Sequence, residues 1–205
     1  MLMKMIADLH IHSRFSMATS KEGTPENLDF WARKKGISLI GTGDFTHPVW
    51  REELKERLVS EGNGLYRLRD EYVKEESRKF PGEGTHFVVS GEISSIYKKN
   101  GKTRKIHNVI LLPSLEAADA MAQRLEKIGN IHSDGRPILG LDSHDLLEMM
   151  LDVCPEGILI PAHIWTPHFS VLGAKSGFDS VEECFEELTP YVHALETGLS
   201  SDPAM

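Results

Sequence analysis

The sequence has few cysteines and no long apolar run. Its two cysteines, Cys154 and Cys184, lie far apart and form no CxxC pair. They indicate neither a disulfide framework nor a thiolate zinc site, and we expect both to be buried thiols. No apolar run approaches the roughly 18 residues that a membrane span needs. These absences favour a reducing, cytoplasmic location.

Excess positive charge is also missing. The 23 Lys and Arg residues face 31 Asp and Glu residues, which gives a formal net charge of −8. This balance argues against a protein that coats polyanions, although a local basic patch or bound metal ions could still attract phosphate. Repeats and low-complexity segments are absent. The length of 205 residues and the apolar content of 40% are those of one ordinary globular domain, residues 1–205.

Strand-like runs alternate with helix-like runs, which predicts an α/β architecture with largely parallel strands. The expected strands are residues 4–10, 37–44, 86–97, 105–112, 137–141, 157–163 and 192–197. Helix starts are marked by capping residues, namely Thr24 before Pro25, Ser114 before Leu115, and Ser180 with Glu183.

Two helical segments can be described further. The first helix should end at Gly36. The helix after Ser114 carries an apolar stripe that should cover the sheet, formed by Leu115, Ala118, Met121, Ala122, Leu125 and Ile128. Residues 50–79 are charged and interrupted by glycine, so we expect two surface helices there.

Asp8, His10 and His12 form the motif DLHIH at the end of a short apolar run. A strand alternates faces at every residue, so these three side chains would project from one face while Leu9 and Ile11 pack on the other. Imidazoles and a carboxylate on one face are the beginning of a metal site.

Further histidines and acids stand where later strand-like runs end. In barrels and open parallel sheets, the carboxyl ends of the strands form the face that carries active sites. The residues at these positions are Asp44, His47, Glu92, His107 and His163. Nitrogen and oxygen ligands without thiolates suit divalent ions, and a glutamate can bridge two cations. We therefore predict two or three ions of zinc, manganese, iron or magnesium.

A single histidine is more often structural than a metal ligand, so each of these residues is weak evidence alone. Their agreement at matching strand ends is what favours a metal site. The remaining histidines lack this placement and should be structural or exposed: His86, His132, His144, His168 and His193.

These motifs together resemble the PHP domain, the polymerase and histidinol phosphatase superfamily. The matching segments, in chain order, are DLHIHS, GTGDFTH, GEIS, HNVILLP and PAH. The resemblance extends over nearly the whole chain and implies a distorted (β/α)7 barrel, similar to a TIM barrel, whose trinuclear metal cluster hydrolyses phosphoester bonds. It implies metal ligands at His10, His12, Glu92, His107 and His163, with Glu92 as a bridge. It also implies a catalytic centre that includes Asp44, Glu92 and His163.

Two departures from the family pattern bear on the site. The family has Asp-His after its second strand, whereas Phe45 follows Asp44 here, so His47 is the candidate replacement ligand. The family also has a late Asp-x-His, and Asp202 has no histidine two residues later. We therefore expect the chain to be an N-terminal piece, truncated before the last strand and lacking one or two ligands.

Within the superfamily, the motifs are most similar to the endonuclease Q family. The similar segments are TGDFTHP, GLDSHDLLEM, PAHIWTPHFS and ALETGLSSDP. This resemblance implies DNA repair, in which a strand is nicked on the 5′ side of a deaminated base such as uracil or hypoxanthine. It also implies a zinc-binding region and further C-terminal parts that read the lesion.

A basic segment, IYKKNGKTRKIH, lies between Glu92 and His107. Its Asn100-Gly101 pair is the preferred two-residue hairpin turn. The basic residues around the turn are Lys98, Lys99, Lys102, Arg104 and Lys105. This hairpin should stand near the metal face and could bind a phosphate backbone. The alternative is a solvated hairpin tip that lysines keep soluble.

Three functions remain open from the sequence. A metal-dependent endonuclease acting on DNA with a damaged base is favoured by the basic hairpin. A phosphatase of small phosphomonoesters, such as histidinol phosphate, would need a compact pocket and no basic groove. A non-catalytic PHP scaffold would lack metal ligands, and most of them are retained here.

Overall fold

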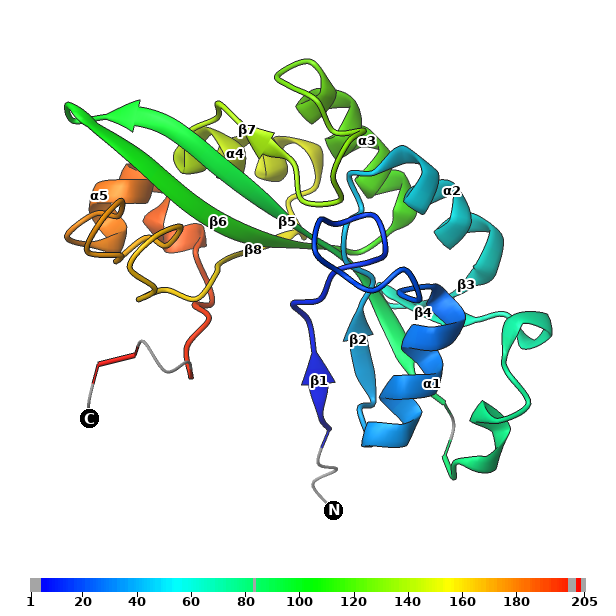
Figure 1. Ribbon diagram of the computed structural model, residues 1–205. Coiled ribbons are helices and arrows are strands. Elements are labelled where there is room, and N and C mark those ends of the chain that lie inside the picture. The colour runs from blue at the N-terminus through cyan, green and yellow to red at the C-terminus, as the bar shows by residue number, and fades with distance from the viewer. Residues whose placement is uncertain (1–4, 83, 199–201, 204–205) are drawn as a thin grey trace.

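The structure is a computed structural model, and it describes residues 5–82, 84–198 and 202–203. One eight-stranded sheet organises the fold and curls into half a barrel around its long strand β5 (Figure 1). The strands are β1 (Ala7–Asp8), β2 (Leu39–Gly41), β3 (Leu58–Gly62), β4 (Leu65–Leu68), β5 (His86–Lys99), β6 (Lys102–Leu112), β7 (Ile138–Leu139) and β8 (Ile158–Pro161).

The sheet is mixed, so the expectation of largely parallel strands is wrong. β1 pairs with β2, and β2 and β7 pair with β5, all in parallel. The pairs β3–β4, β4–β5, β5–β6 and β6–β8 are antiparallel. The cause is local, because the two-residue Asn100-Gly101 turn between β5 and β6 can join only antiparallel strands. Both turn residues have the positive φ that such a turn requires, 53° and 71°.

Helices cover the sheet and begin where capping residues predict. They are α1 (Pro25–Lys35), α2 (Pro48–Arg57), α3 (Leu115–Glu126), α4 (Ser143–Val153) and α5 (Val181–Phe185), with the 3₁₀ helices η1 (Asp70–Tyr72), η2 (Ser77–Lys79) and η3 (Glu186–Tyr191). Thr24, Ser114 and Ser180 cap α1, α3 and α5, and α1 ends at Gly36 as expected. No helix within the described ranges has both the length and the apolar character to cross a membrane.

The core lies between the β5–β6 pair and the helices α3 and α4. Ile93 and Ile106 are fully buried on the sheet side, and Met121 and Leu146 are fully buried on the helix side. The apolar stripe predicted for α3 is buried, except that Ile128 lies past the helix end and is exposed. Each buried side chain of this size contributes about 1.5–3 kcal/mol to folding. This core fixes β5 and β6, which carry two residues of the site described below.

The segment 50–79 differs from its prediction of two surface helices. It contains α2, then the β3–β4 hairpin and two 3₁₀ turns. The hairpin turn is Asn63-Gly64, whose φ values of 55° and 78° suit a two-residue turn. Helix α2 is also more than a surface helix, because Trp50 is completely buried and donates a hydrogen bond to the carbonyl of Gly43 at 2.8 Å.

Both ends of the described chain meet the sheet with short pairings. Of the expected strand 4–10, only β1 forms, and Lys4 lies outside the described residues. The expected strand 192–197 does not form. Instead, Glu196 makes two backbone hydrogen bonds beside the end of β8, with Pro161 at 3.1 Å and Ile164 at 3.0 Å. This single pairing brings Glu196 close to the first histidines of the chain.

Candidate metal centre

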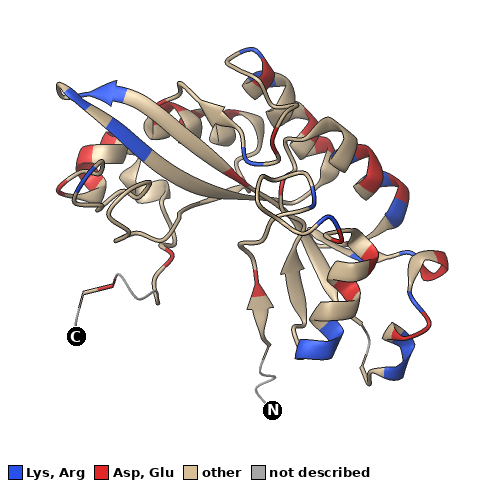
Figure 2. Ribbon diagram, viewed as in Figure 1, with Lys and Arg blue, Asp and Glu red and all other residues tan. Residues whose placement is uncertain are grey.

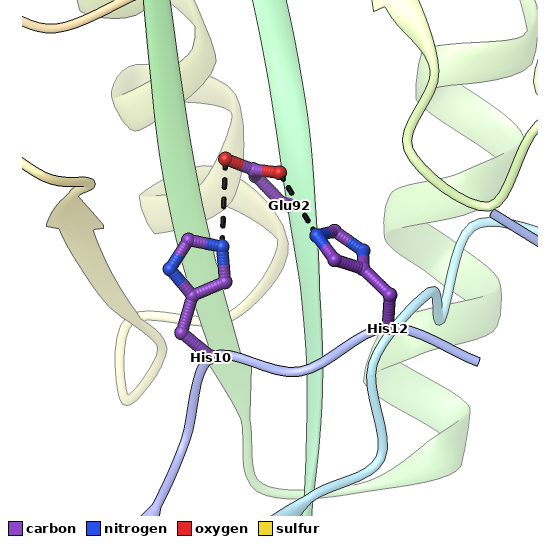
Figure 3. Close-up of side chains that lie close together, drawn as sticks. All are labelled: His10, His12 and Glu92. Atoms are coloured by element: carbon purple, nitrogen blue, oxygen red, sulfur yellow. Dashed lines mark ion pairs between the residues drawn. The ribbon is translucent and has the colours of Figure 1, made fainter. Parts of the chain in front are cut away.

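Glu92 projects from the middle of β5 and is almost completely buried, at 2% exposure. The segment after β1 crosses in front of it and presents His10 and His12 (Figure 3). His10 Nε2 lies 3.4 Å from Oε1 of Glu92, and His12 Nε2 lies 3.3 Å from Oε2. Each carboxylate oxygen therefore faces a different imidazole.

Two further histidines, from β6 and from the end of β8, reach the same carboxylate. His107 lies on β6 on the same face as Glu92, and its Nδ1 is 2.7 Å from Oε1 of Glu92. His163 follows β8 with a left-handed φ of 30°, and its Nε2 is 3.5 Å from the same oxygen. Four histidines from three parts of the chain thus surround one buried glutamate.

Orphaned atoms at this centre fit a cation. Oε1 of Glu92 and Nδ1 of His107 are both buried, and neither has a hydrogen-bond partner, although they lie 2.7 Å apart. Buried polar atoms are almost always paired, so these two atoms lack a partner that a cation bound by both of them would supply. Two groups here have ligand atoms within 4.8 Å of one another: His10 with His12 and Glu92, and Glu92 with His107 and His163. Their shared member, Glu92, is suited to bridge two ions.

Acidic residues orient two of the imidazoles. Asp44 is fully buried and accepts hydrogen bonds from His12 Nδ1 at 3.0 Å and from the Ser13 amide and hydroxyl at 2.7 and 2.6 Å. Glu196 accepts from His10 Nδ1 at 3.0 Å and from the His163 amide at 2.6 Å. Because a carboxylate only accepts, Nδ1 is the donor in each imidazole, so Nε2 faces Glu92 and can bind a cation once it has lost its proton. Carboxylates that fix the tautomer in this way are typical of metal-binding histidines.

The charges at the centre explain the protonation of its metal-free form. Burial lowers the pKa of His10, but its hydrogen bond to Glu196 and its ion pair with Glu92 outweigh burial and raise that pKa to about 10. Burial also lowers the pKa of His12, but its contacts with Asp44 and Glu92 outweigh burial and raise that pKa to about 9. Burial alone would raise the pKa of Glu92, but its close contacts with the four imidazoles lower that pKa far below its usual range. Protons therefore occupy positions that a cation could take.

Some residues predicted as ligands lie elsewhere. Asp8 is exposed on β1 and belongs to neither group, because β1 ends there and strand alternation does not continue to His10. His47 is buried against Phe15, with ring centroids 4.1 Å apart, and also belongs to neither group. Asp44 reaches the centre only through His12.

Two residues at the centre are absent from the sequence prediction. Glu196 ends the apolar run 192–195, so the strand-end rule that selects His163 selects it too. Arg136 lies just before β7 and places Nη1 3.3 Å from Oε2 of Glu92. Nothing in the sequence around Arg136 indicates this position, which depends on the parallel pairing of β7 with β5.

Some basic residues of the hairpin pair with acids or are buried, and others are exposed. Arg104 is buried at 3% exposure and donates to the Gly177 carbonyl and to Glu183. Lys99 pairs with Glu186 at 2.7 Å and with Asp142 at 3.3 Å. Arg104 and Lys99 therefore attach the hairpin to the rest of the fold. Lys98 and Lys102 are exposed, and Lys105 is half-buried.

Known proteins with a similar sequence cover most of this chain. An uncharacterized protein of Methanocaldococcus jannaschii is 33% identical over 175 residues, which are 85% of this chain and 18% of that protein. An uncharacterized protein of Bacillus subtilis is 30% identical over an alignment of 217 positions, which covers 98% of this chain and 50% of that protein. The chain thus spans half or less of the length of these curated relatives. No protein family model matches it.

Solved structures give a more informative match. The lesion-specific endonuclease Q of Pyrococcus furiosus superposes with a TM-score of 0.76 at 28% identity, over 96% of this chain and 42% of that one. The chain is similar to endonuclease Q. A second endonuclease Q structure, with a TM-score of 0.74 and 43% of its chain covered, contains a 27-mer duplex with an abasic lesion at the active site.

A more distant structure shares the fold. A protein of Bifidobacterium adolescentis assigned as a metal-dependent phosphoesterase matches with a TM-score of 0.56 at 14% identity, over 94% of this chain and 77% of that one. The resemblance to endonuclease Q and to the PHP-type fold that the motifs predict is thus confirmed.

Proposed function

We propose that this chain forms the metal-binding, catalytic part of a DNA repair endonuclease that hydrolyses a phosphodiester bond 5′ to a deaminated base. The observation that carries the proposal is the convergence of four histidines on Glu92, with two buried atoms that lack a hydrogen-bond partner. The similarity to endonuclease Q supports the choice of DNA over a small phosphomonoester. Uracil and hypoxanthine are the bases we propose.

Each residue has a proposed task. His10, His12, Glu92, His107 and His163 would hold two or three divalent ions, with zinc, manganese, iron and magnesium as the ions to be tested. Such ions, when bound, neutralise phosphate charge and lower the pKa of a water molecule. Asp44 would fix the orientation of His12. Arg136 has an exposed part beside Glu92, from which its guanidinium could contact a phosphate oxygen.

We also propose that residues 1–205 belong to one domain, in which the curled sheet forms part of a PHP-type (β/α)7 barrel. The half-barrel curvature around β5 and the positions of the site residues beside β1, β5, β6 and β8 support this reading (Figure 1).

A nicking assay tests the proposed reaction. The complete protein is stripped of metal, reloaded with manganese, magnesium or zinc, and incubated with duplexes that contain uracil, hypoxanthine, an abasic site or no lesion. We expect metal-dependent nicks 5′ to uracil and hypoxanthine, and intact undamaged DNA. Hydrolysis of p-nitrophenyl phosphate without any DNA cleavage would instead identify a phosphatase, and inactivity with every ion would favour a scaffold.

Metal content tests the ligands separately from activity. We expect the double substitution His10→Ala with His12→Ala to lower the bound transition metal measured by elemental analysis. His168→Ala is the matched control, because this imidazole is exposed and belongs to neither metal group. An unchanged metal content in the double variant would contradict the site.

A further inference from the structure

The β5–β6 hairpin has two faces that carry different cations. Residues paired directly across an antiparallel ladder lie on the same face, and faces alternate along each strand. Glu92 therefore shares its face with Lys98, Lys105 and His107, through the pairs Ser94–His107, Ile96–Lys105 and Lys98–Thr103. We name this the metal-side face. Lys99, Lys102 and Arg104 lie on the opposite face, which we name the back face.

The back face is largely neutralised by acidic residues. Arg104 meets Glu183 at 3.2 Å and packs its guanidinium 3.9 Å from the centroid of the Phe178 ring. Lys99 meets Glu186 and Asp142. Figure 2 shows the acidic α5 region next to the blue arms of the hairpin. The back face thus holds the hairpin in place.

The metal-side face, in contrast, presents lysines that pair with no acid among the residues that the structure describes. From Ser94 to His107, this face of the hairpin contains no acidic residue. Lys98 is exposed. Ser94, directly across from His107, has a buried hydroxyl without a hydrogen-bond partner.

The ring of Phe169 lies next to both Lys105 and His107. The Lys105 ammonium lies 5.5 Å from the centroid of the Phe169 ring, and that ring lies 4.6 Å from the ring of His107. Phe169 has a left-handed φ of 61°, fixed by hydrogen bonds from the His107 amide at 3.0 Å and to the Ser176 hydroxyl at 3.2 Å. A strained residue held by two bonds gives Lys105 a defined position rather than that of a free surface lysine.

The spacing of these cations matches a nucleic acid strand. Two residues along a strand advance about 7 Å, which is the spacing from His107 to Lys105. Lys98 lies diagonally across the ladder from Lys105, at a similar spacing. Neighbouring phosphates of one DNA strand have a similar separation. We propose that the metal-side face binds the DNA strand that enters the metal centre, with Lys105 and Lys98 each contacting one flanking phosphate. This inference rests on the proposed endonuclease function.

A nucleic acid strand fits better than a membrane or an acidic peptide. The row of lysines is continuous with a centre suited to phosphoester hydrolysis, and the anions nearest to a bound scissile phosphate are the next phosphates of the same strand. Contacts of this kind give affinity without sequence preference.

Binding measurements on single variants test the inference. We compare Lys105→Gln and Lys98→Gln with Lys102→Gln, which removes the same charge from the back face of the same hairpin. Fluorescence anisotropy of metal-stripped complete protein with labelled uracil-containing and undamaged duplexes gives affinity at several salt concentrations. We expect each metal-side variant to weaken binding about 5- to 10-fold near 0.1 M salt and to reduce the slope of log K against log salt by about 0.9. The factor should be equal for both duplexes, and Lys102→Gln should bind like the wild type.

The controls separate this inference from the proposed function. Equal melting temperatures exclude a folding defect, and Lys105→Arg should restore binding because it restores the charge. If all three glutamine variants bind equally while the wild type nicks uracil DNA, the proposed role of the metal-side face is wrong and the endonuclease function stands. If the wild type binds DNA with lysine-dependent affinity but cleaves none, the role of the metal-side face stands and the proposed chemistry fails. Absence of any DNA binding by the wild type overturns the role of the metal-side face.

Discussion

At the scale of single residues, Asp44 acts on the proposed metal centre through His12. It is buried, it has a left-handed φ of 51°, and its three hydrogen bonds come from Ser13 and His12. A carboxylate in this position keeps the proton on Nδ1 of His12, which leaves the Nε2 lone pair for a cation.

Asp44→Asn should therefore weaken metal binding although it preserves side-chain size. An amide competes poorly as an acceptor for the imidazole, so we expect the metal affinity to fall by about 10- to 100-fold. Isothermal titration calorimetry with zinc or manganese measures the change. Glu61→Gln is the control, because Glu61 contacts His86 Nδ1 at 2.6 Å away from the centre. Equal affinities of both variants would assign Asp44 a purely structural role.

Proton release is a second consequence at this scale. The pKa values of about 10 for His10 and about 9 for His12 mean that both imidazoles are protonated at pH 7 in the metal-free protein. A metal ion must displace these protons, so its apparent affinity should rise as the pH increases from 7 toward 9. Calorimetry in two buffers of different ionisation enthalpy should detect proton release at pH 7 that declines at higher pH. Binding without proton release would contradict this account.

Most members of the centre could be predicted from the sequence because each signal is local. His10, His12, His107 and His163 stand in or directly after short strand-like runs, and Glu92 lies inside one. Arg136 could not be predicted, because it reaches Glu92 only through the pairing of β7 with β5. Glu196 has the same strand-end signal as His163, but its contact with His10 spans 186 residues of sequence.

At the scale of elements, features set by neighbouring residues could be predicted, and features set by distant residues could not. Capping residues and the Asn100-Gly101 turn act over a few residues, and the structure has those helix starts and that hairpin. The Asn63-Gly64 pair is also a two-residue hairpin turn, but the charged residues around it are typical of surface helices, so the prediction favoured helices there. The Asn100-Gly101 turn also fixes the antiparallel polarity of β5 and β6, whereas the polarity of β4–β5 and β6–β8 depends on which distant runs pair and does not follow from periodicity.

The attachment of the hairpin depends on Arg104. Its guanidinium satisfies the Gly177 carbonyl and Glu183 and stacks on Phe178, and it is almost inaccessible to water. Arg104→Met should leave these partners unpaired and lower the free energy of unfolding by about 2–4 kcal/mol. Urea denaturation measures this loss.

Lys102→Met provides the comparison for Arg104→Met. Lys102 lies two residues earlier on the same face but is exposed, so its replacement should change stability by less than about 0.5 kcal/mol. Similar losses for both variants would show that the back face does not anchor the hairpin through Arg104.

At the scale of the whole molecule, the metal centre joins segments from both ends of the described chain. His10 and His12 precede the first helix, Glu196 follows the last, and β5, β6 and β8 supply the rest. A ligand that binds only the folded chain stabilises it, by about 2.7 kcal/mol at 100 times the dissociation constant. Metal binding should therefore stabilise the whole fold rather than one loop.

Metal removal should accordingly lower the melting temperature by about 5–10 °C for a chain of this size. The metal-free protein should also lose stability as the pH rises through the folded pKa values of about 9 and 10, because protonation of His12 and His10 favours the folded state only below them. Differential scanning calorimetry with and without metal, at pH 7 and pH 9, measures both effects. The double variant His10→Ala with His12→Ala should show a smaller metal-dependent shift and should lack this pH dependence. A full metal-dependent shift in that variant would mean that the stabilising ion binds elsewhere, which would separate the stability of the fold from the four histidines around Glu92.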